Sequence, residues 1–561
     1  MKFIKRAAAG ILALVVSTGF IAGCTEYESG NEKVYTYDEA ITELNAFNQQ
    51  IEADEVKAPM DIYDTGSDKT MLADIDTFPL TVEGRGSINI EIAAATEMSS
   101  AAPDDWMNLV AESFNRERYE INGKTVSVTV RKITSGEVLT YMTEGDYRPD
   151  VYAPSSDAWG QMLHAKGVGV ITVADRIAGN TAGVLMEKGT YDTFVEKYKE
   201  VNVKNVLDAS VAGDLTFAYT NPYTSSTGLN ILTAMLYAFD SSDPLSETAQ
   251  KELLEYQKQS PPVAYTTGVL RDQASKGIIK AMVMEEQAYQ NTPELKNYVY
   301  TPAGIRHDHP LYTFDYVSAD KQQAAKLFAD YCLNDENQKL ADKKGFNLHN
   351  DYKSQPNGLD GAGYLAAQKI WKQSKDGGQP IIAVFIADIS GSMAGVPINS
   401  LKESLLATSG YISSDNYIGL VSFADDVHIN LPIKKFDNEQ RAYFSGAVKS
   451  LDIEGNTATY DAVLIALKMM IDKKEEIPNA KLMLFLLSDG EQNRGYSLDR
   501  VAPIVGGLKI PVYTIGYNLS GSNSDATNQL KRLSGINEAT LINASSDDLI
   551  NHMRNLFNVE L

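Results

Sequence analysis

The 561-residue chain has only two cysteines, Cys24 and Cys332. With so few thiols no network of disulfides can stabilise the fold, so the chain must depend on its hydrophobic cores. Cys332 stands among Phe328, Tyr331 and Leu333. We therefore expect it to be a buried, small hydrophobic residue without a disulfide partner.

Basic residues are also fewer than acidic residues. The chain has 50 Lys and Arg against 74 Asp and Glu, which gives a net charge of −24 at pH 7. This charge argues against nucleic acid or an anionic membrane face as a partner. It is compatible with cation binding, although an acidic surface that only favours solubility explains it equally well.

Recognisable catalytic motifs are missing. The sequence has no G-x-S-x-G elbow, no H-E-x-x-H, no P-loop and no pair of carboxylates at a catalytic spacing. His307 and His309 flank Asp308, but a zinc site needs three or four ligands and the sequence places no further His or Cys beside them. Enzymatic activity is therefore the least supported class, and the chain is not expected to be an enzyme.

Long hydrophobic runs are absent too. Ala7–Phe20 is apolar but shorter than the roughly 20 residues that span a membrane, and no later segment is longer. Lys2, Lys5 and Arg6 precede it, which is typical of an export signal.

The end of this signal, Ile21-Ala22-Gly23-Cys24, resembles the lipobox of bacterial lipoproteins. The resemblance implies that residues 1–23 are a signal peptide and that the thiol of Cys24 is lipidated after cleavage. Lipid chains alone would then anchor the protein to the outer face of the bacterial cytoplasmic membrane, at the cell surface or in the periplasm. A cleaved secretory signal and an uncleaved anchor are the alternatives. Residues 24–86 are polar and acidic, with a weakly helical patch at 41–51, and predict a partly ordered tether.

Strand-like and helix-like segments alternate from residue 87 onward. Ile88–Ala94 and Thr125–Arg131 have the character of buried strands, each followed by a helical segment, which predicts a parallel sheet. Serines cluster where strands pass into helices, where free N–H groups suit a small polar or anionic ligand. The candidate solute-binding residues are Ser99, Ser100, Ser135, Ser155 and Ser226. Helix capping alone is the alternative role for them.

A further segment carries a resemblance. The strand-like Leu215–Thr220, the sequence Asn221-Pro222-Tyr223-Thr224-Ser225-Ser226-Thr227-Gly228 and the apolar helix Leu229–Phe239 resemble type-2 periplasmic solute-binding proteins, including the oxyanion-binding branch. Ala281–Glu286, Tyr298–Gly304 and a helix over Asp320–Cys332 extend the similarity. The resemblance implies a two-lobed domain over residues 87–355 with a solute cleft. The glycine-containing residues 356–379 that follow predict a linker around a short helix, Tyr364–Gln373.

The most informative stretch is Asp388-Ile389-Ser390-Gly391-Ser392-Met393, which follows the unbroken apolar run Ile381–Ala387. The run predicts a buried parallel strand that ends on a carboxylate and two hydroxyls. Ligands gather at such strand ends in α/β folds, and Mg²⁺ prefers oxygen donors of this kind. A strand end with a helix cap and no metal is the alternative.

The pattern D-x-S-x-S resembles the metal-ion-dependent adhesion site of von Willebrand factor A (vWA) domains. Gly455-Asn456-Thr457-Ala458-Thr459-Tyr460-Asp461-Ala462 and Ser488-Asp489-Gly490 are similar to the next two elements of that family, with Asn456 in place of a glycine. The resemblance implies a doubly wound, Rossmann-like vWA domain over residues 380–561. It also implies a divalent-cation site, with Mg²⁺ expected and Mn²⁺ or Ca²⁺ as alternatives, formed by Asp388, Ser390, Ser392, Thr457 and Asp489.

The expected fold class is therefore α/β, and the expected function is metal-dependent binding of a protein partner at the cell surface. In the vWA family a carboxylate of the partner completes the shell of the ion. The alternative is a solute receptor of an ABC-type importer with an appended vWA domain, and a combined function would couple the two. Asp425, Asp426 and His428 follow a predicted strand, where turn formation is favoured over a second ion site.

Overall fold

The strand that ends at Asp388 is the central element of a seven-stranded sheet. β14 (Ile381–Asp388) lies between β15 (Tyr417–Phe423) and β17 (Lys481–Ser488) and is parallel to both. All its side chains are buried, because successive residues point into cores on opposite faces of the sheet. The strand order is β1-β16-β15-β14-β17-β18-β19. The other strands are β1 (Ala53–Glu55), β16 (Val427–Lys435), β18 (Val512–Tyr517) and β19 (Leu541–Ala544).

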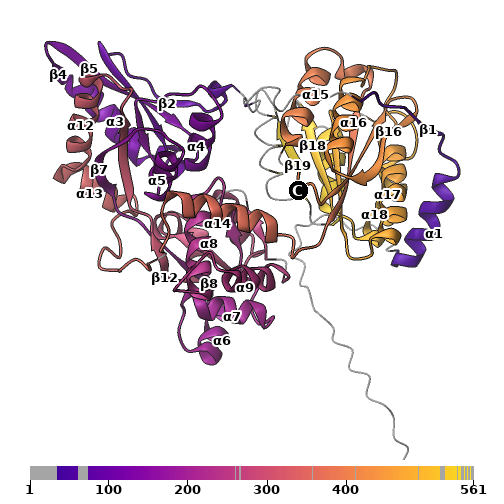
Figure 1. Cartoon of the computed structure of the whole chain (residues 1–561), viewed down its shortest axis with the longest axis horizontal. Helices are drawn as coiled ribbons and strands as arrows, with labels where there is room; N and C mark the ends of the chain where they lie inside the picture. Colours follow the sequence, from indigo (N-terminus) through magenta and orange to yellow (C-terminus); the bar gives the residue numbers. More distant parts are fainter. Residues whose placement is uncertain are drawn as a thin grey trace, which may run out of the picture.

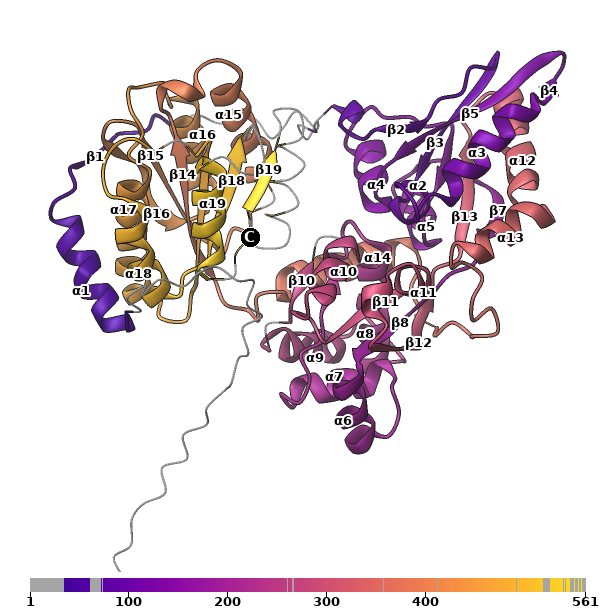
Figure 2. The same cartoon turned by 180° about the vertical axis from the view of Figure 1, so that it is seen from behind.

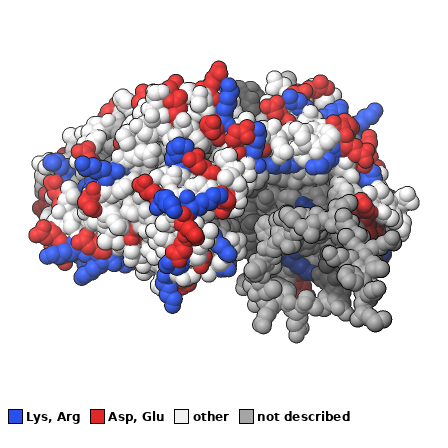
Figure 3. Space-filling view, turned by 90° about the horizontal axis from the view of Figure 1, so that it is seen from below, with Lys and Arg blue, Asp and Glu red and all other residues white. Residues whose placement is uncertain are grey.

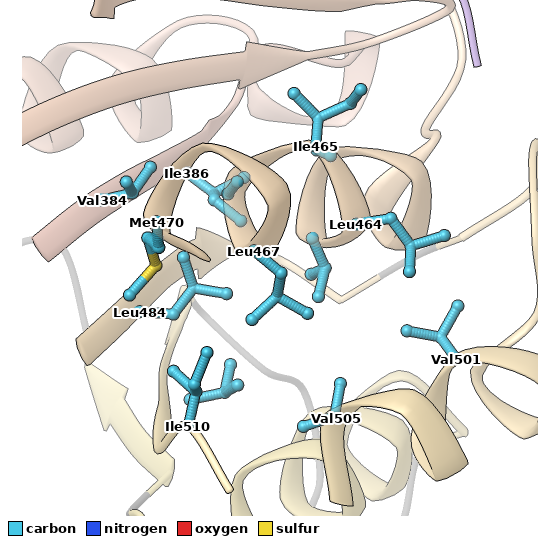
Figure 4. Close-up of a cluster of buried hydrophobic side chains, with 14 of the residues drawn as sticks. Val384, Ile386, Leu464, Ile465, Leu467, Met470, Leu484, Val501, Val505 and Ile510 are labelled. Carbon is cyan, nitrogen blue, oxygen red and sulfur yellow. The ribbon is translucent and has the colours of Figure 1, made fainter. Parts of the chain in front are cut away.

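Helices cover both faces of this sheet. On one face, Val384 and Ile386 pack with the apolar sides of α17, α18 and α19 (Figure 4). On the other face, Ala383 and Phe385 pack with α15 and α16. The helices are α15 (Val396–Ser409), α16 (Asn438–Lys449), α17 (Thr459–Glu476), α18 (Leu498–Leu508) and α19 (Asp525–Gly535). The result is the doubly wound α/β unit that the sequence predicts.

The structure is a computed structural model of the chain. It describes residues 35–60, 72 and 74–544 apart from 260, 265, 266, 357, 411, 491, 518–524, 538 and 540, and then residues 549, 553, 556 and 561. The expected signal peptide and Cys24 lie outside the described residues. Among the helices that are described, none combines the length and apolar character required to cross a membrane.

A second sheet, of mixed parallel and antiparallel pairs, forms the first lobe of a two-lobed body (Figure 1). Its strand order is β2-β5-β3-β6-β13-β7, with β3, β5 and β6 parallel as predicted and β13 antiparallel to its two neighbours. The strands are β2 (Leu80–Val82), β3 (Ile88–Ala94), β4 (Glu120–Ile121), β5 (Lys124–Lys132), β6 (Val151–Ala153), β7 (Val170–Ala178) and β13 (His309–Phe314). The helices are α2 (Thr96–Ser99), α3 (Trp106–Glu117), α4 (Ser135–Thr143), α5 (Ala158–Ala165), α12 (Ala319–Cys332) and α13 (Asp335–Lys343). Cys332 is fully buried in this core, as expected.

The second lobe is an insertion between β7 and β13. It contains a three-stranded antiparallel sheet, β11-β8-β12, and the parallel pair β9–β10. The strands are β8 (Thr181–Glu187), β9 (Tyr219–Thr220), β10 (Val263–Ala264), β11 (Ala281–Glu285) and β12 (Tyr298–Arg306). The helices are α6 (Lys188–Tyr198), α7 (Val203–Val211), α8 (Ser226–Phe239), α9 (Glu247–Gln257), α10 (Thr267–Ser275) and α11 (Glu286–Gln290). The chain crosses between the lobes at 179–180 and 307–308, and these two crossings are joined by a hydrogen bond from His307 N to Asn180 O (3.1 Å).

The segment expected to be a tether is, for residues 36–56, part of the vWA-like unit. Helix α1 (Tyr37–Asn48) packs against α17 and α18, with Ala40, Leu44 and Phe47 buried in the core (Figures 1 and 2). β1 adds a parallel edge strand to β16. The physical reason is the spacing of these apolar residues, which forms one face of a helix although the segment as a whole is acidic.

The short helix predicted within the linker is present, but it is not part of a free linker. Residues 361–374 form α14 (Gly361–Ser374), which packs against α5 of the first lobe and against α8 and α9 of the second. Trp371 is fully buried there, and its Nε1 donates to Tyr219 Oη (2.7 Å). This helix is therefore part of the two-lobed body, and only a few residues separate it from β14.

The acidic and basic side chains are interspersed over the described surface seen in Figure 3.

Candidate functional site

The first group of predicted ligands lies at the carboxyl end of β14. Asp388 is fully buried, and its Oδ1 accepts a hydrogen bond from the backbone N of Ser390 (2.9 Å). A turn of 3₁₀ helix, Gly391–Met393, then places Ser392 on the surface with its Oγ 3.2 Å from the Oγ of Ser390. The carboxylate is thus inside the sheet edge, and the two hydroxyls lead from it to solvent.

These donors fit a small, hard cation. Oxygens on adjacent corners of a Mg²⁺ octahedron lie about 3 Å apart, since each bond is about 2.1 Å long, and the two serine hydroxyls have a similar separation. Burial and, to a smaller extent, the charge of Asp489 raise the pKa of Asp388 to about 6, against the hydrogen bonds from Ser390 and Ser488. A divalent ion would favour the ionised form that burial disfavours.

The loop of Thr457 is fixed against this turn by backbone hydrogen bonds. Gly391 N donates to Gly455 O (3.1 Å), and Glu454 N donates to Ile389 O (2.8 Å). Thr457 itself is buried, and its backbone N donates to Oδ1 of Asn493 (2.9 Å). Nothing in the sequence motifs indicated that Asn493 orients this threonine.

Asp489 directly follows β17, beside β14, and is half-buried. The preceding residue, Ser488, has a role that the sequence analysis did not assign. Its Oγ donates to Oδ2 of Asp388 (2.6 Å) and accepts from Gly490 N (2.9 Å), where the chain turns at a φ of 85°. The sequence did contain a sign of this role, namely the hydroxyl residue that precedes Asp489 in Ser488-Asp489-Gly490. The structure therefore brings the five predicted ligands to one edge of the sheet.

Asn456 replaces a glycine of the vWA pattern, and its side chain has a partner. Its Nδ2 donates to Oδ1 of Asp425 (2.5 Å). A Cβ at Gly455 would lie 1.8 Å from Oδ2 of the same aspartate, so a larger residue there would displace this side chain. Asp425 and Asp426 also pair with Arg494, at 2.9 and 3.3 Å. These contacts agree with a structural role for the two aspartates.

A second candidate site lies between the two lobes. The cavity has a volume of about 230 Å³ and is lined from both lobes. Four of the five predicted serines line it: Ser100, Ser135, Ser155 and Ser226. Ser99 does not, because its buried hydroxyl donates to Ala94 O and Ala95 O within its own lobe. The hydroxyl thus bonds back to the preceding turn, which is neither a solute contact nor an N-cap.

The serines make contacts across the cleft. Ser155 Oγ of the first lobe donates to Ser226 Oγ of the second (2.6 Å), and Trp159 Nε1 donates to the same oxygen (2.7 Å). An ion pair between Arg271 and Asp104 (3.0 Å) also joins the lobes. The structure thus has the two lobes closed on the cavity.

Two glutamates that the sequence analysis did not single out also line this cavity. Burial, followed by the charge of Glu285, raises the pKa of Glu97 to about 7. Glu285 is 4% exposed. Burial would raise its pKa, but His307 and the hydroxyl of Thr227 lower the pKa on balance. No local motif marks these glutamates, since folding alone brings them to the cleft.

Comparisons with known families agree with this division of the chain. Residues 95–347 match the family model of bacterial extracellular solute-binding proteins, and residues 383–556 match that of the von Willebrand factor type A domain. Neither is a family of enzymes.

Individual proteins match one part of the chain each. Human inter-alpha-trypsin inhibitor heavy chain H3 is 30% identical over 156 residues, which are 25% of this chain but only 17% of that protein. The sulfate-binding protein SubI of Mycobacterium tuberculosis is 14% identical, with a TM-score of 0.35, over 51% of this chain and 91% of its own. A von Willebrand factor type A structure from Catenulispora acidiphila is 19% identical, with a TM-score of 0.29, over 32% of this chain and 42% of its own. The chain therefore contains a solute-binding domain followed by a C-terminal von Willebrand factor A domain.

Proposed function

We propose that the chain is a surface lipoprotein that binds a protein partner through a divalent cation in its vWA domain. The observation that carries the proposal is the arrangement at the end of β14, where two serine hydroxyls 3.2 Å apart adjoin a buried carboxylate. Asp388, Ser390, Ser392, Thr457 and Asp489 would hold the ion, with Mg²⁺ expected and Mn²⁺ or Ca²⁺ as alternatives.

The expected metal ligands differ in exposure and therefore in role. The exposed Ser392 and half-buried Asp489 form the accessible rim, while Asp388 supplies negative charge from within. Two carboxylates offset the charge of a divalent ion, and the hydroxyls are weak donors. When bound, the ion supplies an electrophilic centre that a carboxylate of the partner can reach, without any bond being made or broken.

Titration calorimetry of the whole chain with Mg²⁺ and Mn²⁺ tests the site. We expect Asp388→Ala to abolish binding, and Asp472→Ala, on the exposed side of α17, to leave it unchanged. On intact cells, cross-linking to neighbouring proteins should require the metal and should be lost both with a chelator and with Asp388→Ala. Metal binding that survives Asp388→Ala would contradict the proposal.

The second candidate function is a solute receptor of an ABC-type importer, for an oxyanion or another small polar solute. The closed cavity between the lobes favours it, because both lobes contribute its lining. A thermal-shift screen of oxyanions, sugars, amino acids and amines on the whole chain tests it. If no small solute shifts the melting temperature, this function is contradicted.

Anchoring at Cys24 is part of the proposal and rests on the sequence. Metabolic labelling with a fatty-acid analogue should mark the wild-type chain and should fail with Cys24→Ser. Labelling of the serine variant would contradict lipidation at that thiol.

A further inference from the structure

Three of the polar groups left unsatisfied in the cavity between the lobes are hydrogen-bond acceptors, and a fourth, the hydroxyl of Thr134, can donate or accept. Oε1 of Glu97, Oε2 of Glu285 and Oε1 of Gln287 are buried and have no partner. Glu285 and Gln287 are at least nine-tenths buried. Unsatisfied buried acceptors are costly, so a ligand that supplies donors would relieve the cost at all three.

The assignment of the Gln287 amide is fixed by its neighbour. Its Nε2 lies 2.7 Å from Oδ1 of Asp104, and a carboxylate can only accept. The amide oxygen must therefore be the atom without a partner, and exchanging the oxygen and nitrogen would place two acceptors together.

The charged residues that line the cavity also favour a ligand that donates hydrogen bonds. The ionisable residues that line the cavity are Glu97, Asp104, Glu285 and Arg271. Arg271 is already paired with Asp104, which also accepts from Gln287 and Asn291. Glu97 and Glu285 then face the cavity without a lining cation, although the Nδ1 of the buried His307 lies 3.6 Å from Oε1 of Glu285. An oxyanion would meet these carboxylates, whereas a cation would be stabilised by them.

A metal ion is a poorer occupant than an organic cation. Within the described part of the chain, no three His, Cys, Asp or Glu side chains converge closely enough to hold an ion. The cavity of about 230 Å³ instead has room for a small molecule, and its serine and threonine hydroxyls can bind the polar part of one.

We propose that the cleft binds a small organic cation whose protonated nitrogen donates hydrogen bonds to Glu97, Glu285 and Gln287. The inference rests on the solute-receptor function, and it selects a cation where the sequence left an oxyanion or another small polar solute open. The remainder of the ligand lies among the hydroxyls of both lobes, and it stabilises the closed form because each lobe supplies one of the two glutamates.

The test is a series of ligands of equal length and different charge. α,ω-Diamines, amino alcohols, diols and dicarboxylates are titrated into the whole chain by calorimetry, with saturating Mg²⁺ so that the vWA site does not change. We expect affinity to fall in that order and the dicarboxylates not to bind. Glu285→Gln and Glu97→Gln should each weaken amine binding roughly tenfold to a hundredfold. Glu255→Gln, on the surface of α9, should not weaken it.

The possible results distinguish a failure of the cation inference from a failure of the solute-receptor function. Tighter binding of diols or dicarboxylates than of amines would overturn the cation inference and leave a solute receptor. Binding by no member of the series, nor by the oxyanions and sugars of the wider screen, would overturn both. If either glutamine variant unfolds, the other decides, and equal amine affinity in a folded variant would count against the inference.

Discussion

Ser488 donates a 2.6 Å hydrogen bond to Oδ2 of Asp388, a residue 100 positions earlier in the chain. The two lie at the ends of the parallel strands β17 and β14, so the bond fixes the carboxylate where the strands stop. The other carboxylate oxygen accepts from Ser390 N. The carboxylate of Asp388 is therefore held by the end of the neighbouring strand and by the turn that follows β14.

Removal of this hydroxyl should weaken metal binding without removing a ligand. Groups that orient metal ligands typically change affinity by roughly tenfold to a hundredfold, so we expect Ser488→Ala to weaken Mg²⁺ binding by that factor. Calorimetry with Mg²⁺ measures it. The matched control is Ser409→Ala, whose hydroxyl bonds only within α15, to Leu406 O. Equal affinities in the two variants would show that the Ser488–Asp388 bond has no part in the site.

The docking of α1 predicts a stability effect that a tether would not have. Leu44 is fully buried against the vWA core, so Leu44→Ala should destabilise that domain by about 2–5 kcal/mol. Calorimetry should show a lower melting transition for the vWA domain. Leu333→Ala is the control, because that leucine is 45% exposed at the end of α12. An unchanged melting transition in Leu44→Ala would show that the segment is a tether and not part of the vWA core.

The sequence could predict what local patterns determine. The continuous apolar run before Asp388 predicted β14 almost to the residue, and Ile88–Ala94 coincides with β3. Both are buried strands of parallel sheets, where hydrophobicity alone marks the element. The convergence of the five metal-site residues on one edge followed from motif order, because parallel strands place their carboxyl ends together.

Long-range contacts could not be predicted in the same way. The burial of α1 depends on Ala40, Leu44 and Phe47, whose spacing was visible but whose acidic surroundings suggested a solvated segment. The linker was likewise expected from its glycines, whereas Trp371 packs into the second lobe. Glu97 and Glu285 come to the same cavity only because the two lobes fold against each other. Pairings of this kind depend on the tertiary fold and not on any local propensity.

His428 links the edge strand to the sheet in a pH-dependent way. Its Nδ1 lies 2.5 Å from Asp54 of β1, and its Nε2 lies 3.2 Å from Glu454. Burial lowers the pKa of His428, but the two carboxylates outweigh it and raise the pKa on balance. The protonated form is thus stabilised by folding. This stability is fully present below the unfolded pKa of about 6.5 and is lost as the pH rises through the higher folded pKa.

We therefore expect the vWA domain to lose stability as the pH rises above about 6.5, relative to His428→Gln. The measurement is the difference in melting temperature between the two proteins as a function of pH. It should be largest at the acidic end and fall toward the alkaline end. Asp54→Asn should reduce this dependence, whereas a difference that grows with pH would contradict the assigned sign.

Closure of the lobes requires a glycine at position 136. Gly136, in the first turn of α4, donates its N–H to Thr224 O of the second lobe (3.2 Å). A Cβ at this position would lie 1.9 Å from the backbone oxygen of Tyr223, which cannot move aside as a flexible side chain could. Alanine should therefore hold the lobes apart, and it should leave the separate core of each lobe intact.

Small-angle scattering of the whole chain should then give a larger radius of gyration for Gly136→Ala than for wild type. Solute affinity should fall roughly tenfold or more, because the closed form that binds is less populated. Gly410→Ala is the control, since nothing lies within 4 Å of a Cβ there. The melting temperature of the vWA domain should not change in either variant. Superimposable scattering curves for Gly136→Ala and wild type would mean that α4 adjusts locally, and closure would then not depend on this contact.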